Sequence, residues 1–282
     1  MRIWDILAVC ILIVIALLGK YPPFGNDQSN EIRRPPIETV KPPRNQPWQP
    51  SAGPVLSITL EDAKKSSTGT AFSVAKDGIW VTARHVADGC EKIALQTGTK
   101  RFTQVRRIVH HPNADISILQ TNYGAQPLPG IGTRIFRRQD GYSFGFPKGK
   151  PGDVHAKVIG RRTMAVKGRY STREPVLAWA QINRIPDRGT HLGGISGGPW
   201  VDKNGLIIGV HVAGAPRRGR SYSSTPLSLL YILKHVGLYN NKVGSTKSNL
   251  SVHKTNFSRT GDRLRQSLTV TKVYCIVSNN WR

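Results

Sequence analysis

Short apolar runs separated by glycine, proline, asparagine and aspartate fill the chain between residues 54 and 239. They are rich in β-branched residues and alternate apolar with polar positions, and turn residues recur about every 8–12 positions, which is typical of an antiparallel sandwich or barrel. The pattern predicts a mostly β body, with strands at 55–60, 70–75, 79–83, 102–110, 116–121, 154–159, 176–182 and 206–212.

One segment of this body has a helical period instead. From Pro226 to Leu238, apolar residues recur on one face of a helix, at Leu229, Leu233 and Val236. We therefore expect a single helix at 226–238, at the end of the β body.

The N-terminus is apolar without interruption from residue 6 to residue 18. These thirteen residues are fewer than the roughly 20 that span a bilayer, and Ile3, Trp4 and Gly19 bring the stretch close to the lower limit. We expect residues 1–19 to be a membrane anchor. A cleaved signal peptide is the alternative, although the sequence around Gly19 matches the small-residue cleavage pattern poorly. Either interpretation exports the rest of the chain.

Two further segments flank the body. Residues 20–54 hold nine of the 19 prolines and are expected to form a Pro-rich linker. Residues 240–282 are rich in serine, threonine, asparagine and lysine, so we expect a flexible basic tail. Its only apolar cluster, at 270–277, could be a strand or a docking segment.

The 282-residue chain is strongly basic, with 41 Lys and Arg against 16 Asp and Glu and a net charge of +25. Such a charge first suggests nucleic acid. However, the basic pairs, such as Arg137-Arg138 and Arg161-Arg162, are scattered and no nucleic-acid motif accompanies them. Attraction to an anionic membrane or cell wall is a better interpretation, as is simple solubility, and nucleic acid is disfavoured as a partner.

The three cysteines form no CxxC motif and no Cys/His ladder, so the sequence predicts no metal site. The adjacent His110 and His111 lack a third ligand at suitable spacing, and Pro112 favours a turn there. Cys90 and Cys275 could pair in an oxidising compartment, but the sequence carries no sign that they are close.

Two candidate catalytic side chains lie at predicted strand ends. His85 follows the apolar run 78–84, and Asp115 precedes the apolar run that starts at Ile116. A carboxylate at such a place is costly to bury unless its charge is used. Each residue alone also has a structural interpretation, as a strand-end histidine or a turn-capping aspartate.

The strongest signal is the stretch from Gly193 to Pro199, in which Ser196 is surrounded by glycines. Glycines on both sides let the backbone turn tightly, expose the serine oxygen and direct backbone N–H groups to one point. One such donor typically stabilises a developing oxyanion by about 3 kcal/mol. A glycine-rich hairpin would explain the turn but not the serine inside it.

The order His85, Asp115, Ser196 is that of the chymotrypsin-type triad. With the motifs Thr-Ala-x-His, His-Pro-x-x-Asp-Ile and Gly-x-Ser-Gly-Gly-Pro and the run 209–214, the chain resembles a trypsin-like serine peptidase, of the bacterial HtrA-like and single-domain type. The resemblance spans about 55–238. It implies an all-β, chymotrypsin-like fold with two six-stranded antiparallel barrels and a C-terminal helix, and no PDZ domain. We expect a peptidase domain at 55–239, with barrels at roughly 55–128 and 129–225.

The resemblance also implies roles for single residues. Ser196 would be the nucleophile, His85 the base and Asp115 the group that orients His85, while the N–H groups of Gly194 and Ser196 would form the oxyanion hole. This chemistry needs neither metal nor cofactor. Digestive relatives have an aspartate at the position of Ile195, which pairs with the new N-terminus after zymogen cleavage. Because isoleucine cannot form that pair, activation by insertion of a new N-terminus is not expected.

A substrate pocket is implied at Thr190, His191, His211, Val212 and Gly214. Because Thr190 replaces the pocket aspartate of trypsin, a preference for Lys or Arg is not supported. His211 resembles the imidazole of glutamyl endopeptidases, which favours an acidic or amide side chain. A small apolar side chain is the preferred alternative, with His211 packed beneath the pocket.

Together these features predict an exported serine endopeptidase that acts on a protein or peptide. It would be single-pass in the inner membrane with its catalytic domain in the periplasm, or secreted if the N-terminus is cleaved. A catalytically silent trypsin-fold module that binds anionic partners through its basic surface is the alternative function. The sequence predicts no oligomeric state.

Overall fold

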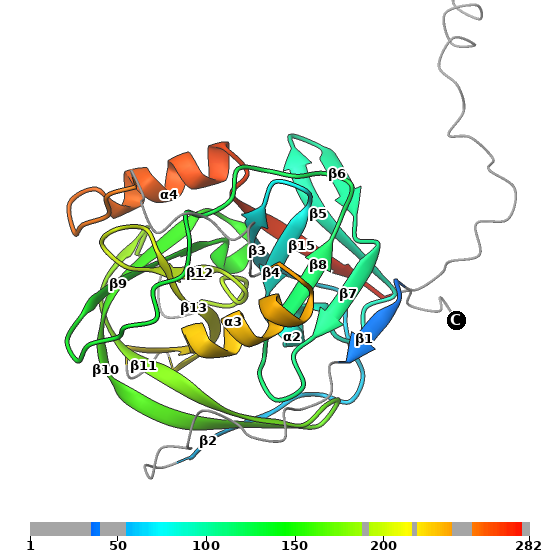
Figure 1. The fold of residues 1–282 in the computed structure, drawn as a ribbon, viewed down its shortest axis with the longest axis horizontal. Coiled ribbons are helices and arrows are strands. Elements are labelled where there is room, and N and C mark those ends of the chain that lie inside the picture. The colour runs from blue at the N-terminus through cyan, green and yellow to red at the C-terminus, as the bar shows by residue number, and fades with distance from the viewer. Residues whose placement is uncertain (1–34, 40–54, 188–191, 216–218, 239–249, 278–282) are drawn as a thin grey trace, which may run out of the picture. The chain divides into compact units, whose positions relative to one another are not determined.

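The computed structural model describes residues 35–39, 55–187, 192–215, 219–238 and 250–277. Strands dominate these residues and form two curled sheets, one of eight and one of seven strands (Figure 1). The predicted anchor at 1–19 lies outside the described residues. Within the part that is described, no helix is long and apolar enough to cross a membrane.

The first barrel is built mainly from residues 67–120. Its strands β4, β8 and β7 follow β3 around the sheet. The Val105 N–H extends the pairing of β6 with β5 by donating to the Ile93 carbonyl, and the Arg106 N–H extends the pairing of β7 with β8 by donating to the Gln120 carbonyl. The bounds are β3 Ser67–Ala75, β4 Ile79–Thr82, β5 Lys92–Gly98, β6 Arg101–Gln104, β7 Arg107–His110 and β8 Ser117–Gln120. The antiparallel pairs among them are β3 with β4, β4 with β8, β8 with β7, and β5 with β6.

The remaining place in this barrel, between β3 and β5, is filled by the C-terminal strand β15 (Val270–Ile276). Val273 lies opposite Gly69 of β3 and Leu95 of β5, and both pairings are antiparallel. A disulfide between Cys90 and Cys275 joins the strand covalently to the barrel, with a Cα–Cα distance of 5.4 Å. Figure 1 shows this red strand between much earlier parts of the chain.

The expectation of a flexible tail at 240–282 is therefore wrong for residues 250–277. This segment holds helix α4 (Phe257–Gln266) as well as β15, and Phe257, Val270 and Val273 are buried. Arg265 of α4 donates to both carboxylate oxygens of Asp153, at 2.6 and 3.0 Å. A side chain at Gly261 would collide with the same carboxylate, so α4 needs glycine at this close approach.

The second barrel consists of six antiparallel strands, closed by the long pair β10 and β11. The strands are β9 Asp140–Gly145, β10 Gly152–Lys167, β11 Thr172–Ile185, β12 Pro199–Val201, β13 Ile207–Ala215 and β14 Arg220–Ser224. Helix α3 (Pro226–His235) follows, and the Thr225 hydroxyl accepts from the Ser228 N–H at its start. The predicted two-barrel β fold with a C-terminal helix is confirmed.

Two short strands extend the sheets in parallel. β2 (Val55–Thr59) pairs with β10, and β1 (Ile37–Thr39) pairs with β7. Because β1 lies within the predicted Pro-rich linker, residues 37–39 are part of a sheet instead of a spacer. Glu38 forms an ion pair with Arg107 of β7, and the rest of the predicted linker lies outside the described residues.

Large apolar side chains fill the interior of each barrel and the space between them. Trp80, Ile93 and Leu119 are buried in the first barrel, and Trp179 and Trp200 stack in the second with ring centroids 4.2 Å apart. Burial of each such side chain stabilises the fold by about 1.5–3 kcal/mol. The two packed barrels give a rigid frame for the loops between them.

Replacing Cys275 by serine tests the contribution of the tail to this frame. The disulfide joins positions 185 residues apart, so its loss should lower the free energy of unfolding by about 2–5 kcal/mol. Urea denaturation of the full chain measures the change, and Cys10→Ser removes a thiol outside the bridge as a control. An unchanged urea midpoint in Cys275→Ser would contradict the role of the bridge.

Candidate active site

His85 is presented by the short helix α2 (Arg84–Ala87), which begins just after β4 ends. Its Nδ1 lies 2.7 Å from Oδ2 of Asp115, and its backbone N–H donates to Oδ1 at 2.8 Å. The imidazole is about a quarter exposed, at 24%, whereas the Asp115 side chain is buried. The second imidazole nitrogen is therefore left for another partner.

The backbone of α2 is also fixed from outside the helix. Lys64 donates from Nζ to the His85 carbonyl at 2.7 Å, and burial lowers the pKa of Lys64 to about 8. Arg169 donates to Asp88 at the C-terminal end of α2, at 2.9 Å. These contacts restrict how His85 can move relative to Asp115.

Asp115 lies between β7 and β8, and its buried carboxylate has a third hydrogen bond. The hydroxyl of Tyr170, in the connection from β10 to β11, donates to Oδ1 at 2.9 Å. The Arg84 guanidinium lies over the Tyr170 ring, 4.1 Å from the centroid. With these donors the carboxylate can be buried in its ionised form.

Burial and the Asp115 charge raise the pKa of Tyr170 well above its usual range, so the hydroxyl keeps its proton. The sequence reasoning missed this residue. Tyr170 stands 55 positions from Asp115, and no local pattern marks a tyrosine in a strand connection as a partner of a distant carboxylate.

Glu174 of β11 was missed for the same reason. Its Oε1 accepts the backbone N–H of Asp115 at 2.8 Å, and the side chain is buried. Burial raises the pKa of Glu174 to about 8, so it is mostly protonated at neutral pH. Glu174 thus anchors the Asp115 backbone without placing a second full charge beside the carboxylate.

The loop that carries Ser196 is anchored to both barrels. The Ser196 carbonyl accepts from the Thr70 N–H of β3 at 2.9 Å, and Gly197 donates to the His211 carbonyl of β13 at 2.8 Å. Gly197 has φ +87°, and a Cβ there would lie 2.1 Å from the Thr70 carbonyl and 2.9 Å from the N of Ala83. The loop therefore lies against the residues that precede α2, the helix that carries His85.

The preceding glycines contact the turn η1 (Pro147–Gly149). Lys148 donates its backbone N–H to the Gly193 carbonyl at 2.6 Å, and the Thr70 hydroxyl donates to the Gly194 carbonyl at 2.7 Å. Because C=O and N–H point in opposite directions in a trans peptide, the first bond turns the Gly194 N–H away from η1. Gly194 has φ +99°, a region that glycine adopts without strain.

His211 is buried next to this loop. Its ring stacks on Trp200, with centroids 5.8 Å apart, and its Nδ1 has no hydrogen-bond partner among the described residues. Burial, and to a smaller extent the nearby His85, lower the pKa of His211 to about 3, so the ring is neutral. Of the other predicted pocket residues, Val212 is buried and Gly214 is exposed, while Thr190 and His191 lie outside the described residues.

Metal-ligand geometry is absent from the residues that the structure describes, where no group of three or more His, Cys, Asp or Glu could hold an ion. His110 contacts the Ser117 hydroxyl through Nδ1 at 2.6 Å, and His111 accepts from the Asn113 N–H at 3.0 Å. Both rings are buried, and burial lowers their pKa to about 4 and about 3. These histidines therefore have structural contacts.

Comparison with known proteins gives one matching family model, a trypsin-like peptidase domain, over residues 69–210. A curated relative, the probable periplasmic serine endoprotease DegP-like of Hahella chejuensis, is 24% identical over 147 residues, which cover 51% of this chain and 29% of the relative. The chain thus spans less than a third of that relative's length.

Among solved structures, the active form of the Rv3671c protease from M. tuberculosis is similar in fold. It has a TM-score of 0.51 and 16% identity, covering 74% of this chain and 96% of that one. The HtrA-type protease AlgW with a decapeptide has a TM-score of 0.46 and 19% identity, covering 61% of this chain and 52% of that one.

Tyr170→Phe removes one donor from the buried Asp115 carboxylate. We expect the free energy of unfolding to fall by about 1.5–3 kcal/mol, the usual size for a hydrogen bond to a charged group. Tyr222→Phe, at a half-buried tyrosine whose hydroxyl has no described hydrogen bond, is the matched control. Equal urea midpoints for Tyr170→Phe and the parent would show that the hydroxyl contributes nothing.

Glu174→Gln tests the raised pKa of Glu174. Its stabilising contribution is complete below the unfolded pKa of 4.5 and is lost as pH rises to about 8, because only the unfolded state then releases the proton. The stability of the parent relative to Glu174→Gln should therefore fall with pH between 5 and 8, by about 1.4 kcal/mol per pH unit. Urea denaturation at several pH values measures the slope, and a slope of zero would contradict the shift.

Proposed function

Because the chain belongs to the trypsin-like peptidase domain family, we propose that it is a serine endopeptidase with the triad His85, Asp115 and Ser196. Membership confirms the resemblance expected from the three motifs. The observation that carries the proposal is the paired contact between His85 and Asp115, in which Nδ1 and the backbone N–H reach the two carboxylate oxygens at 2.7 and 2.8 Å.

In this mechanism the Ser196 oxygen attacks the carbonyl carbon of the scissile peptide. His85 removes the serine proton through Nε2 and then transfers it to the leaving amine, which frees the first product. Asp115 keeps the Nδ1 proton of His85 in place and stabilises the imidazolium. Water then attacks the acyl-enzyme by the same proton transfers, so the second product leaves as a carboxylic acid and Ser196 is restored.

The oxyanion that forms in each step would be bound by the N–H groups of Gly194 and Ser196. The hydrogen bond from Lys148 to the Gly193 carbonyl supports this role, because it directs the Gly194 N–H away from η1. Loss of one such donor costs about 3 kcal/mol of transition-state stabilisation. The turn at η1 would thus keep the oxyanion hole formed before substrate binds.

The substrate pocket is proposed to include Thr190, His191, His211, Val212 and Gly214. Because His211 is buried and neutral, it provides no positive charge to pair with a carboxylate. The pocket therefore favours a small uncharged side chain at the cut site. Its unpartnered Nδ1 could accept a hydrogen bond from an amide side chain.

We place the enzyme in the bacterial envelope, on the periplasmic side. The relative's printed description as periplasmic supports this location, and a disulfide persists in an oxidising compartment. A single-pass anchor at 1–19 in the inner membrane stays a prediction, as does the alternative of secretion after cleavage. A polypeptide substrate follows from the peptidase chemistry.

A fluorophosphonate probe tests the triad directly. We expect the full chain to be labelled, the Ser196→Ala variant to remain unlabelled, and Asp115→Asn to react about 10⁴-fold more slowly because His85 loses its orienting partner. Circular dichroism confirms that each variant is folded. A folded parent that resists labelling would favour the silent binding module, and labelling of Ser196→Ala would place the nucleophile elsewhere.

A further inference from the structure

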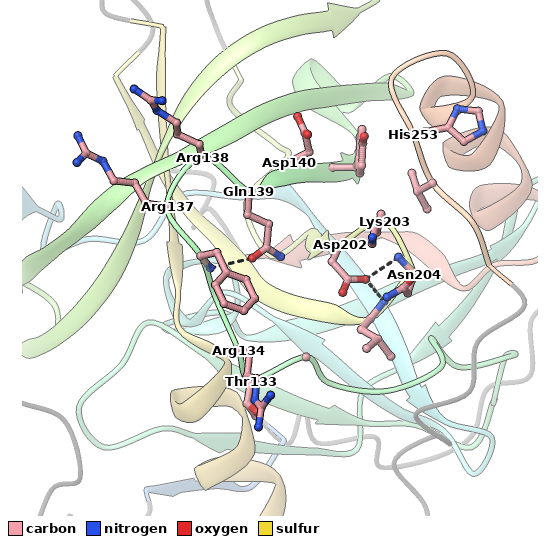
Figure 2. Close-up of a pocket in the computed structure, with 15 residues that line it drawn as sticks. Thr133, Arg134, Arg137, Arg138, Gln139, Asp140, Asp202, Lys203, Asn204 and His253 are labelled. Carbon is pink, nitrogen blue, oxygen red and sulfur yellow. Dashed lines mark hydrogen bonds between the residues drawn. The ribbon is translucent and has the colours of Figure 1, made fainter.

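A groove of about 830 Å³ lies on the second barrel (Figure 2), and Ser196 is not among its lining residues. Its walls are the segment 132–139 before β9, the turn 202–204 after β12, and residues 252–253 before α4. β9 runs from Asp140 in the groove to Gly145, whose backbone approaches Thr70 and Ile195 beside the candidate nucleophile. The groove therefore opens at the other end of this strand.

Four exposed cationic side chains surround the groove: Arg134, Arg137, Arg138 and Lys203. None of them forms a side-chain hydrogen bond or ion pair with a residue that the structure describes. In Figure 2, Arg137 and Arg138 lie on one side of the groove and Lys203 on the opposite side. These charges are available to a ligand.

The two carboxylates of the groove are already engaged. Asp140 contacts His155 Nε2 at 2.8 Å and Lys157 Nζ at 2.9 Å. Asp202 accepts the backbone N–H groups of Asn204 and Leu206, at 2.8 and 2.9 Å, as the dashed lines in Figure 2 show. Asp140 is thus paired with a cation of its own, and the single charge of Asp202 offsets only one of the four cations. The groove keeps a net positive charge and favours an anionic ligand.

The turn that presents the arginines is preformed. Gln139 donates its N–H to the Phe136 carbonyl at 3.2 Å, and its side-chain oxygen accepts the Phe136 N–H at 2.9 Å. Arg138, which has φ +65°, donates its N–H to Val158 of β10 at 2.8 Å. A ligand would thus not have to order this part of the backbone on binding, which preserves affinity.

An exposed aromatic ring accompanies the charges. The side chain of Phe136 is 66% exposed, and the buried Tyr142 and Val252 and the half-buried Leu206 also line the groove. A concave site with an exposed ring between free cations matches a ligand that carries both carboxylates and an apolar side chain. A bilayer surface is flat and does not fit a concave site. A nucleic-acid base can stack on Phe136, and the competition experiment below separates that ligand from a polypeptide.

We propose that this groove is a docking site for an acidic polypeptide segment with an apolar side chain, carried by the protein substrate. The link to the substrate rests on the proposed peptidase function, whereas binding of the acidic segment does not. The six residues of β9 span about 20 Å, so the segment must lie at least about six extended residues from the scissile bond. Long substrates would gain from the groove, and short ones would not.

Binding is tested on the full-length Ser196→Ala variant, which cannot cleave the probe. The probe is a fluorescein-labelled twelve-residue peptide of glutamate and serine with one phenylalanine, followed by fluorescence anisotropy. Charge reversal at Arg137→Glu with Arg138→Glu should weaken binding about tenfold or more, through lost charge complementarity. Arg161→Glu with Arg162→Glu, which changes the chain's charge equally outside the groove, should change it less than about twofold. Lys203→Glu provides a second groove variant on a separate turn.

Equal weakening by the two double variants would overturn the proposal, because net charge alone would then explain binding. So would equally tight binding of a peptide in which serine replaces the phenylalanine. Displacement of the peptide by phosphatidylglycerol vesicles or single-stranded DNA, with the same dependence on Arg137 and Arg138, would assign the groove to that ligand instead.

The effect of the groove on cleavage is measured in the chain that keeps Ser196. Arg137→Glu with Arg138→Glu should lower the kcat/KM of a long acidic substrate and leave a short peptide substrate and fluorophosphonate labelling unchanged. A parent that the fluorophosphonate does not label would refute the proposed function, whereas the binding of the acidic peptide measured by anisotropy would remain valid. Intact labelling with equal loss for long and short substrates would refute the docking site alone.

Discussion

The buried carboxylate of Asp115 is the constraint that joins the two barrels at the candidate site. Buried in the interior, its oxygens require hydrogen-bond donors, and these come from His85 of the first barrel and Tyr170 of the second. Glu174, also from the second barrel, holds the Asp115 backbone. The orientation of His85 therefore depends on how the barrels pack, and a change in that packing would alter the contact between its imidazole and Asp115.

The C-terminal strand supports the other half of the site. Lys272 of β15 lies opposite Thr70 of β3, and Thr70 binds the carbonyls of both Gly194 and Ser196. The disulfide from Cys275 to Cys90 attaches the same strand a few residues beyond α2, which carries His85. Strand β15 thus supports the strand that holds the loop of Ser196, although it begins 71 residues after the Gly-x-Ser-Gly-Gly-Pro motif ends at Pro199.

The positive charge of the protein is distributed unevenly between paired and unpaired side chains. Most acidic groups with resolved contacts are paired with cations or backbone donors, as at Asp140, Asp153 and Asp202. Arg137, Arg138 and Lys203 keep their charges free beside an exposed phenylalanine. A basic surface that served solubility alone would not require an ordered backbone. Here the turn from Phe136 to Gln139 is held by two hydrogen bonds.

The sequence by itself determined the β body and helix α3, because alternation and helical spacing are local patterns. Its motifs also marked His85, Asp115, Gly194 and Ser196 as candidates, through their resemblance to those of trypsin-like peptidases. It left His211 with two interpretations, and it placed the tail outside the fold. Tyr170, Glu174 and the insertion of β15 were decided only by the tertiary structure. Each contributes through a contact with a residue far away in the chain, and a single-sequence pattern carries no information about which distant groups meet when two barrels close.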